Sequence, residues 1–347
     1  MARGQLPRQA DIARVAGVSQ ATVSVVLGGN QGGVRLSEAT RQRVIEAAES
    51  LGYVPDPVAT RLASSRNNLL GLYTFTATFP TDVADSYYPI LVGVEEGAKD
   101  LGQDLILFTG SSTKTHDDAS IRRTRLADGC LFLGRHVPTE SIGRLLDSGF
   151  PLVYIGRRAE LDGRIPYVGA DYVAASALII AKLAELGHRD IRYVREHDNA
   201  PSSADRERGV VEGLAAVGLS EKDVVVRTDG TDLGSEQIHA WRRAGVTAVV
   251  VEETDTGAAF DAVTGALFAA GLSCPADLSL AVLGRPPVRI GPGPVITGFE
   301  VPRREMGRRA VRLLADLVAA KGERPDPHQL LECPPVEGET LGPAQFL

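Results

Sequence analysis

Polar side chains suited to recognition gather in one stretch near the N-terminus, Gln9–Val26, with the sequence QADIARVAGVSQATVSVV. Their hydroxyl and amide groups can donate and accept hydrogen bonds. Two short helices must position them, because apolar residues recur on one face of each half, at Ile12, Ala13, Ala16 and then at Ala21, Val23, Val26. Gly17 can take the left-handed conformation of a tight turn, and Ser19 can cap the second helix. The pattern predicts a helix-turn-helix, whose second helix enters the DNA major groove, although a helical hairpin inside a core would look the same.

Patterns for catalysis or metal binding are absent from the sequence. The six histidines lie far apart, no Ser/His/Asp order or HExxH appears, and no glycine-rich phosphate loop follows a predicted strand. Cys130, Cys274 and Cys333 are scattered and lack metal-ligand spacing, which indicates reduced thiols. His188 follows a predicted helix and is expected to be structural. We therefore predict no enzyme activity, no metal and no cofactor, with an enzyme as the competing class.

The composition indicates a globular chain of several domains. With 347 residues, 44% of them hydrophobic and 23% charged, the chain can fill the cores of two or three domains. No stretch approaches the roughly 20 apolar residues of a membrane span, and the first residues are polar rather than secretory. We expect the protein to stay in the cytoplasm and to have no membrane partner.

Charge is distributed unevenly along the chain, whose net charge is −7. Residues 1–66 contain eight arginines against five acidic residues, whereas residues 67–347 contain 29 basic and 39 acidic ones. The N-terminal part can contact phosphates, and the acidic remainder is repelled by them. This asymmetry predicts a protein that contacts DNA at one end.

A third helix and then a break follow the helix pair. Gly28–Gly33 has the composition of a loop, and Ser37–Leu51 reads as a helix with a polar cap, ended by Gly52. The prolines within Tyr53–Pro57 prevent the helix from continuing. The next segment, Val58–Ala63, is long enough for about two helical turns and, taken alone, is a linker.

Three pieces of sequence, DIARVAGVSQATVSVVLGG, LSEATRQRVIEAAESLGYVPDPVATRLA and LLGLY, resemble the head and hinge of the lac repressor (LacI/GalR) family of bacterial transcription regulators. The resemblance implies DNA contacts in two groups: base-reading Gln20, Ala21 and Val25, and phosphate-facing Ser19, Thr22 and Ser24. Val25 departs from the long polar side chain common at its position. It can contact a thymine methyl but cannot form a bidentate hydrogen bond, so the operator sequence is not predicted.

The same resemblance gives the hinge a role on DNA. In the family the hinge folds into a helix only on the operator, where a leucine from each subunit of a dimer enters a central base step. Leu62 matches that leucine, and Ala63 follows it. Such an apolar wedge kinks the DNA at a cost of a few kcal/mol, which contacts to the bent DNA offset. A short helix is unstable alone, so its folding can be coupled to DNA binding.

From Leu69 onward, short β-rich runs alternate with helix-like segments. The predicted strands are Leu69–Phe75, Leu105–Thr109, Cys130–Leu133, Leu152–Ile155, Ile191–Val194, Val224–Val226, Ala248–Val251 and Leu278–Leu283. The predicted helices are Ile90–Leu101, Ile121–Leu126, Val173–Leu186, Arg206–Val217, Glu236–Arg243, Thr256–Ala270 and Arg303–Ala320. The pattern restarts after Tyr167–Gly169, which predicts two similar parallel-sheet halves with ligand-facing loops at the strand ends.

Local matches such as GVEEGAKDLGQDLIL, LAELGHRDIRYV and ADRERGVVEGL resemble the body of the same family, which is similar to the periplasmic sugar-binding proteins. The resemblance implies a small all-α head at 1–56, a hinge helix and linker at 57–67, and a two-lobed α/β body at 68–347. The implied first lobe spans about 68–168 and 300–322, and the second spans about 169–299 and 323–340. Arg303–Ala320 then returns to the first lobe and Leu330–Val336 to the second.

Effector contacts are implied at the cleft between the lobes. Arg206, in the R-x-x-G setting Arg206–Gly209, matches a family arginine that holds ligand hydroxyls. The other implied contacts are Tyr87, Tyr88, Arg157, Asp171 and Asp255. Each has a structural alternative: an ion pair for Arg157, packing for the tyrosines, and a helix cap for Asp171.

The sequence is thus expected to encode a DNA-binding transcription regulator, a repressor that binds a pseudo-palindromic operator as a homodimer. A small, sugar-like effector in the cleft would control it allosterically. A sensor or solute-binding protein with little DNA affinity is the alternative. The second lobe departs from the family pattern at Glu252–Asp255 and at Leu283–Pro287, so the effector's identity stays open.

Overall fold

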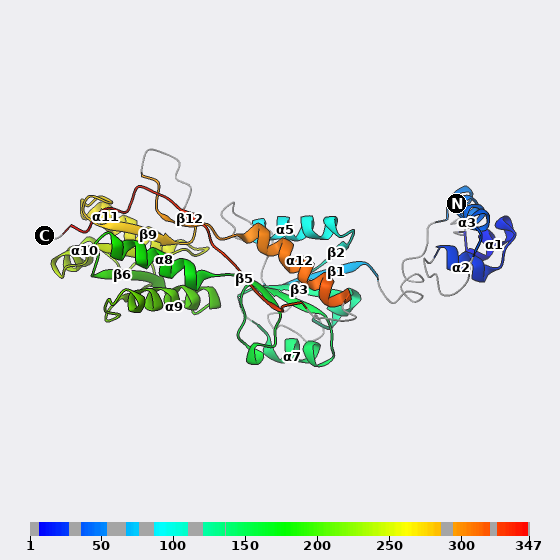
Figure 1. Ribbon diagram of the computed structural model, residues 1–347, viewed down its shortest axis with the longest axis horizontal. Helices are drawn as coiled ribbons and strands as arrows, with labels where there is room; N and C mark the ends of the chain where they lie inside the picture. The colour runs from blue at the N-terminus through cyan, green and yellow to red at the C-terminus, as the bar shows by residue number, and fades with distance from the viewer. Residues whose placement is uncertain are drawn as a thin grey trace. The chain divides into compact units, whose positions relative to one another are not determined.

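The computed structural model describes residues 7–27, 36–53, 67–75, 87–109, 121–135, 137–285, 294–319 and 325–345. The chain divides into two compact units, Met1–Leu69 and Leu70–Leu347, which we call the head and the body. Figure 1 labels their helices and strands. The predicted fold class, a small helical head and an α/β body with two parallel sheets, is confirmed.

Three helices form the described part of the head: α1 (Gln9–Ala16), α2 (Gln20–Leu27) and α3 (Glu38–Ser50). Helices α1 and α2 are bent by 107° relative to each other. Gly17 makes the turn between them in the predicted left-handed conformation, with φ of 63°. This arrangement is a helix-turn-helix.

The head has a core of its own. Ile12, Val23 and Val44, one from each helix, are fully buried together. Ser37 caps α3, because its Oγ accepts a hydrogen bond of 3.2 Å from the Thr40 backbone N–H. The predicted wedge residues Leu62 and Ala63, and the loop Gly28–Gly33, lie outside the described residues.

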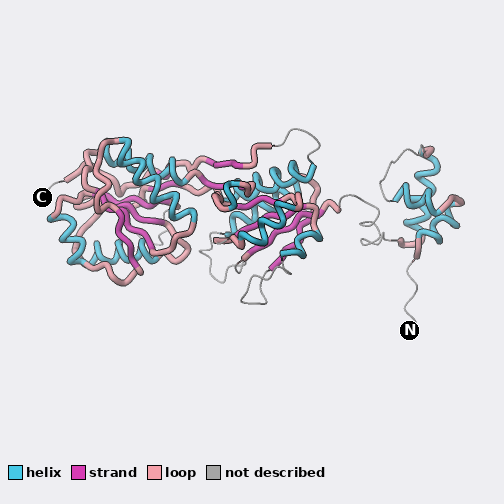
Figure 2. Tube along the Cα trace, turned by 90° about the horizontal axis from the view of Figure 1, so that it is seen from below, coloured by secondary structure: helices cyan, strands magenta, loops and turns pink. Residues whose placement is uncertain are grey.

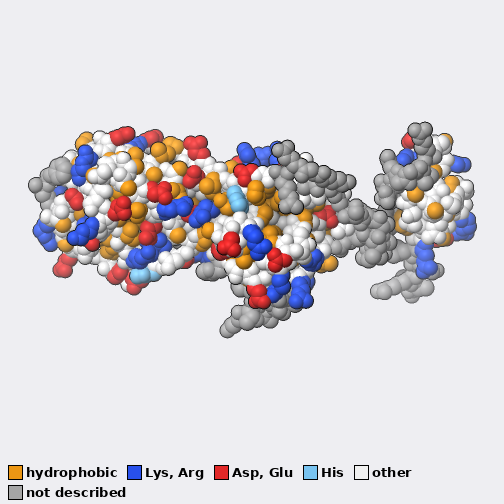
Figure 3. Space-filling view, turned by 60° about the horizontal axis from the view of Figure 1, so that its bottom comes forward, with side chains coloured by type: hydrophobic (Ala, Val, Ile, Leu, Met, Phe, Trp, Pro, Cys, Tyr) orange, Lys and Arg blue, Asp and Glu red, His pale blue; other side chains and the backbone are white. Residues whose placement is uncertain are grey.

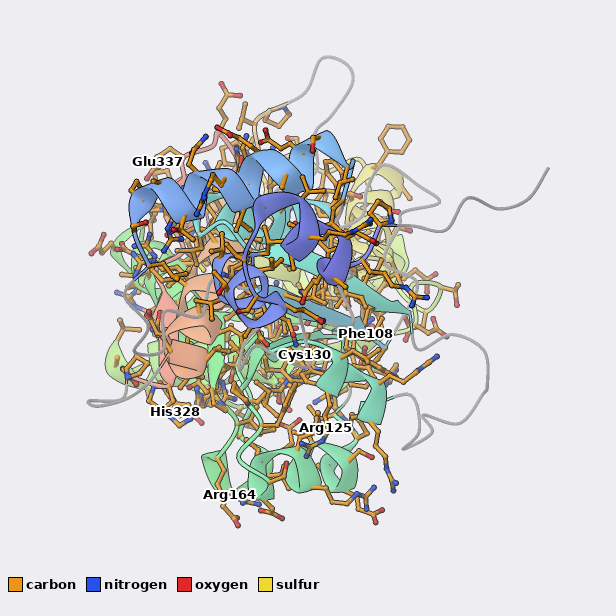
Figure 4. The ribbon with its side chains drawn as sticks, turned by 90° about the vertical axis from the view of Figure 1, so that its right-hand side faces the viewer. Phe108, Arg125, Cys130, Arg164, His328 and Glu337 are labelled. Atoms are coloured by element: carbon orange, nitrogen blue, oxygen red, sulfur yellow. The ribbon has the colours of Figure 1, made fainter. Side chains whose placement is uncertain are left out.

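The first lobe of the body contains a six-stranded sheet in the order β11-β5-β4-β3-β1-β2. Its strands are β1 (Leu69–Thr74), β2 (Asp104–Thr109), β3 (Gly129–Leu133), β4 (Leu152–Ile155), β5 (Tyr167–Ala170) and β11 (His328–Leu331). Strands β1 and β3 pair in parallel with Leu70 opposite Gly129. Cys130 and Phe108, labelled in Figure 4, belong to one apolar cluster of this lobe. All residues of β3 and β4 are buried, as in a parallel sheet covered on both faces.

The second lobe contains a four-stranded sheet in the order β7-β6-β8-β9. Its strands are β6 (Ile191–Glu196), β7 (Val225–Thr228), β8 (Ala248–Glu252) and β9 (Ser279–Leu283), all paired in parallel. Helices α8 (Tyr172–Glu185), α9 (Pro201–Ala216), α10 (Ser235–Arg243) and α11 (Ala258–Ala269) belong to this lobe. Figure 2 shows helices on both faces of each sheet.

Glycines permit the closest helix contact of the first lobe, between α5 (Tyr87–Asp100) and α12 (Arg303–Ala319). A Cβ atom on Gly93 would lie 1.9 Å from the Arg304 carbonyl oxygen, and one on Gly307 would lie 2.3 Å from the Ile90 carbonyl oxygen. Any side chain at these positions would push the helices apart. Figure 1 shows α12 beside α5, and α12 also contacts β3, β4 and β5 of the first-lobe sheet.

One part of the predicted lobe division is wrong. Leu330 and Leu331 are expected in the second lobe, but they belong to β11, which pairs with β5 at the edge of the first-lobe sheet. His328, labelled in Figure 4, begins this strand and stacks on Tyr167 with ring centroids 4.8 Å apart. Without β11, the edge strand β5 would have unpaired backbone N–H and C=O groups. β11 pairs with them before the chain leaves the first lobe. The next strand, β12 (Pro335–Val336), instead pairs with β10 (Gly298–Phe299).

The elements of the first lobe that went unpredicted include β5 and the helix α7 (Thr139–Asp147). The segment that reads as a helix at Ile121–Leu126 ends in a short 3₁₀ helix, η1 (Arg123–Leu126). Charged side chains of both signs are interspersed over the face of the body in Figure 3. Within the described part of the chain, no single helix is long and apolar enough to cross a membrane; α1 and α2 meet that test only as a bent pair.

Candidate functional site

The start of α2 is organised by its own hydroxyl groups. The Oγ of Ser19 accepts a hydrogen bond of 3.1 Å from the Thr22 backbone N–H and lies 2.9 Å from the Thr22 Oγ1. Ser19 is therefore the predicted cap of α2. Gln20 and Ala21 are exposed, whereas Val23 and Val26 face the core of the head.

The outer face of α2 offers few polar atoms. Thr22, Ser24 and Val25 are half-buried. Among the six predicted contacts, on α2 and at its cap, only Gln20 has a long polar side chain. An amide of this kind can donate and accept at a base edge. Hydroxyls beside it suit phosphate oxygens, which position a protein on DNA without reading sequence.

A cavity of about 150 Å³ lies between the two lobes of the body. From the first lobe it is lined by α5, by the ends of β3 and β4 and by the start of α12; from the second it is lined by the starts of α8 and α9 and by the segment after β8. Carboxyl ends of parallel strands and N-termini of helices thus meet there, as at ligand sites of α/β proteins. We call this cavity the cleft.

Arg206 on α9 lines the cleft and is only 3% exposed. Its Nε donates a hydrogen bond of 2.7 Å to the Leu283 carbonyl oxygen, and its Nη2 lies 3.4 Å from the Glu253 Oε2. Its guanidinium carbon lies 4.0 Å from the ring centroid of Tyr172, a cation–π contact. Arg206 is therefore held rigidly at the predicted place.

Three ion pairs between described residues join the lobes across the cleft. Arg157 binds Asp205 with two hydrogen bonds, of 2.6 Å from Nε and 2.5 Å from Nη2. The Nη2 of Arg303 lies 3.1 Å from both carboxylate oxygens of Glu253. The third pair joins Arg135 to Asp198. The hydrogen bonds to Asp205 raise the pKa of Arg157, which keeps this guanidinium charged.

The remaining predicted cleft residues fall into two groups. Tyr87 and Asp255 line the cleft. Tyr88 is 60% exposed and lies outside the lining. Asp171 also lies outside the lining and caps α8, since its Oδ1 accepts a hydrogen bond of 3.0 Å from the Ala174 backbone N–H.

Several cleft residues escaped the sequence interpretation: Arg135, Arg158, Tyr172, Asp205, Glu253 and Arg303. The position of some of them in the sequence, just after a predicted strand, could have identified them. Arg135 and Glu253 are each the second residue after a predicted strand, where side chains of a parallel sheet face its ligand edge. Asp205 and Arg303 have no comparable signal, because they lie on the helices α9 and α12 and not after a strand.

A charged layer lies behind the cleft in the second lobe. Arg195 is 1% exposed, and its Nη1 donates a hydrogen bond of 2.5 Å to the Glu207 Oε2. Its Nε lies 3.9 Å from the Oε2 of Glu252, which is also buried. Burial raises the pKa of Glu252, although the nearby Arg206 lowers it. This layer fixes the ends of β6 and β8, from which the lining residues emerge.

His188 has the structural position expected of it. Its Nδ1 lies 2.8 Å from the Thr247 Oγ1, and its Nε2 lies 3.0 Å from the Gly342 carbonyl oxygen. The ring thus ties the C-terminal segment to the second lobe. Cys130 and Cys333 are buried thiols.

Comparisons with known proteins agree with this architecture. Residues 10–56 match the family described as bacterial regulatory proteins, lacI family, and residues 180–341 match the periplasmic binding protein-like domain. An uncharacterized HTH-type transcriptional regulator of Streptomyces limosus is 30% identical over 90% of this chain and 89% of its own length. The chain belongs to the lacI family. As a lacI-family protein it is a transcriptional regulator, so the prediction of a regulator rather than an enzyme is confirmed.

Solved structures of lacI-family regulators share the whole fold. A complex of the transcriptional regulator CelR with cellobiose is 25% identical, covers 96% of this chain and 99% of its own, and has a TM-score of 0.58. A lac repressor dimer bound to operator and the anti-inducer ONPF is 21% identical, covers 97% of this chain and 99% of its own, and has a TM-score of 0.70. The second likeness concerns the fold alone.

Proposed function

We propose that this lacI-family regulator is a repressor that binds a pseudo-palindromic operator as a homodimer and responds to a small molecule in the cleft. One observation carries the proposal: a helix-turn-helix with an exposed polar face on α2 is joined to a two-lobed body whose strand ends enclose a cavity. Because its target is chromosomal DNA, the protein would work in the cytoplasm.

The proposed DNA contacts at α2 are of two kinds, to phosphates and to base edges. Ser19, Thr22 and Ser24 would hold phosphates, and Gln20, Ala21 and Val25 would face base edges. Since this face has few polar atoms, specificity would depend strongly on DNA shape and on the hinge, with Leu62 and Ala63 at the operator centre.

For the cleft, Tyr87, Arg157, Arg206 and Asp255 are the proposed ligand contacts among those expected from sequence. Their position in the lining of the cleft supports this proposal. The related CelR structure is a complex with cellobiose, which favours a carbohydrate-sized ligand here as well. The cap formed by Asp171 and the exposure of Tyr88 argue against direct roles for these two.

The ion pairs across the cleft suggest how a ligand would act on the head. Any molecule that enters must alter the contacts between Arg157 and Asp205 or between Arg303 and Glu253, and thereby the angle between the lobes. In a dimer, that angle would set the separation of the two hinges. Ligand and operator would then be coupled through two states of one body.

A gel-shift assay with the full-length protein and DNA from upstream of its own gene tests the proposal. We expect sequence-selective retardation that weakens as salt rises, because phosphate contacts release counterions. Leu62→Ala should weaken binding to the selected site far more than binding to unrelated DNA. Absence of selective retardation would refute the proposed operator binding, and equal losses on both DNAs would refute the wedge role of Leu62.

A further inference from the structure

Arginines outnumber acidic residues around the cleft. The lining contains five arginines, at positions 135, 157, 158, 206 and 303, and three acidic residues, Asp205, Glu253 and Asp255. A site of this kind has more positive than negative groups facing one enclosed space. How far the protein itself balances this excess depends on the partners of each arginine.

Two of the three carboxylates of the lining, Glu253 and Asp205, are each shared between two arginines. Glu253 serves two guanidinium groups, Arg303 with its Nη2 3.1 Å from both carboxylate oxygens, and Arg206 at 3.4 Å. Asp205 binds Arg157 at 2.5 Å and also lies 3.4 Å from the Nη2 of Arg208. Each of these carboxylates therefore neutralises part of two cations.

Arg158 has the weakest compensation of the five. It is 5% exposed, and the carboxylate oxygen with which it pairs, Glu160 Oε1, is 3.9 Å away. Its other partners are the carbonyl oxygens of Gly134 and Arg135 and the ring of Tyr154, whose centroid is 4.1 Å from the guanidinium carbon. Within the described residues, its buried Nε has no hydrogen-bond partner.

Two carboxylates just outside the lining also face its arginines: Asp198 pairs with Arg135 at the rim, and Glu160 lies 3.9 Å from Arg158. With these two included, the five arginines face five carboxylates, and the weak point is the long distance at Arg158. Behind the cleft, Glu252 and Glu207 contact Arg195, and Glu207 also lies 3.0 Å from Arg227. That layer thus contains its own cations, and its carboxylates are shared in the same way.

Burying a guanidinium without an anionic partner is costly, and a neutral hydroxyl compensates it poorly. A carboxylate or phosphate oxygen forms charge-assisted hydrogen bonds that are roughly twice as strong as neutral ones. An anionic ligand could also take the place of Asp205 or Glu253 on an arginine without leaving that arginine unpaired. A neutral sugar could not do this.

We propose that the cleft takes an anionic ligand, a small molecule that carries a carboxylate or a phosphate, with its acidic group held by Arg158, Arg206 and Arg303. The inference rests on the proposed function only in treating this molecule as the effector. It narrows the effector to acidic or phosphorylated compounds of carbohydrate size.

Calorimetric titration of the full-length protein tests the ligand class. The probes are inorganic phosphate, glucose 6-phosphate, glucuronate and, as the neutral counterpart, glucose, all at equal ionic strength. We expect phosphate and at least one of the two acidic sugars to bind, and glucose to bind at least about tenfold more weakly. Binding of glucose as tight as that of the acidic sugars, or no binding of phosphate, would overturn the proposal.

Matched variants locate the site of binding. Arg303→Gln and Arg158→Gln each remove one cleft cation, and Arg309→Gln removes one cation from an exposed position on α12. The cleft variants should lose about tenfold or more in affinity for the anionic probe, and Arg309→Gln should lose none. If Arg158→Gln does not fold, Arg303→Gln alone decides. Equal affinities in Arg303→Gln and Arg309→Gln would show binding elsewhere and overturn the proposal.

The operator assay separates this inference from the proposed function. If the wild-type protein selects an operator and only neutral sugars alter that binding, the proposed repressor function stands and the anionic-ligand proposal fails. If anions bind in the cleft but no operator is selected, the reverse holds.

Discussion

Arg157 of the first lobe and Asp205 of the second form a bidentate ion pair, with Nε 2.6 Å from Oδ2 and Nη2 2.5 Å from Oδ1. The carboxylate of Asp205 is almost fully buried, and Arg157 is about a quarter exposed. The pair therefore joins the lobes at a place where water screens it only partly.

Asp205→Asn should destabilise the protein by about 2 kcal/mol, because a largely buried guanidinium loses its main carboxylate partner. Urea unfolding measures this loss. Asp147→Asn is the control, since Asp147 pairs with Arg164 at the exposed position seen in Figure 4, and it should change stability by less than about 1 kcal/mol. Losses of the same size in both variants would contradict a bridging role for Asp205.

Gly93→Ala should destabilise the protein by about 3 kcal/mol, because the added Cβ would lie 1.9 Å from the Arg304 backbone oxygen and force α5 and α12 apart. Gly265→Ala is the matched control in a helix, α11, with no atom within 4 Å of the new Cβ. It should be stabilising by about 0.5 to 1 kcal/mol, since alanine favours helix. Thermal unfolding of both variants distinguishes close packing from helix propensity; a harmless Gly93→Ala would refute the close approach.

Stability should decrease on acidification below pH 6.5 because of His188. Burial lowers the pKa of this imidazole from its ordinary 6.5, although the hydrogen bond to Gly342 partly raises it. The unfolded chain then takes up a proton before the folded protein does, so this contribution is complete above pH 6.5 and is lost as the pH falls through the lower, folded-state pKa.

His188→Gln isolates that contribution. The variant should be less stable at pH 8 and should show a flatter decrease in stability below pH 6.5 than the wild type, as followed by urea unfolding across the pH range. Parallel pH profiles for the two proteins would show that other groups cause the decrease.

Gln20→Ala should reduce binding to the selected operator about tenfold, the effect of losing one good contact to a base, and should leave binding to unrelated DNA unchanged. Fluorescence anisotropy with both DNAs measures this ratio. Gln42→Ala on α3 is the control, because Gln42 already bonds to Glu46 at 3.1 Å on its own helix. A uniform loss on both DNAs would assign Gln20 to backbone contact.

The head was predictable in detail because its signals are local. Apolar spacing identified α1 and α2, Gly17 marked the turn, and the hydroxyl of Ser19 marked the cap, each within a few residues of the structure that it specifies. Strand runs in the body were found for the same reason, as at Leu152–Ile155, which is β4. Of the two alternatives given for Asp171, the helix cap is a short-range feature, and the structure contains it.

What the sequence determined by itself, then, was the order of elements, the helix-turn-helix and the two-sheet body, since periodicity and capping act between neighbours along the chain. Only the tertiary structure decided that β11 completes the first-lobe sheet and that Arg157 faces Asp205 and Arg303 faces Glu253. Those pairings join residues that are distant in sequence. They depend on which sheet edge is open and on how the two lobes close around one cavity. Patterns of neighbouring residues predict neither of these two features.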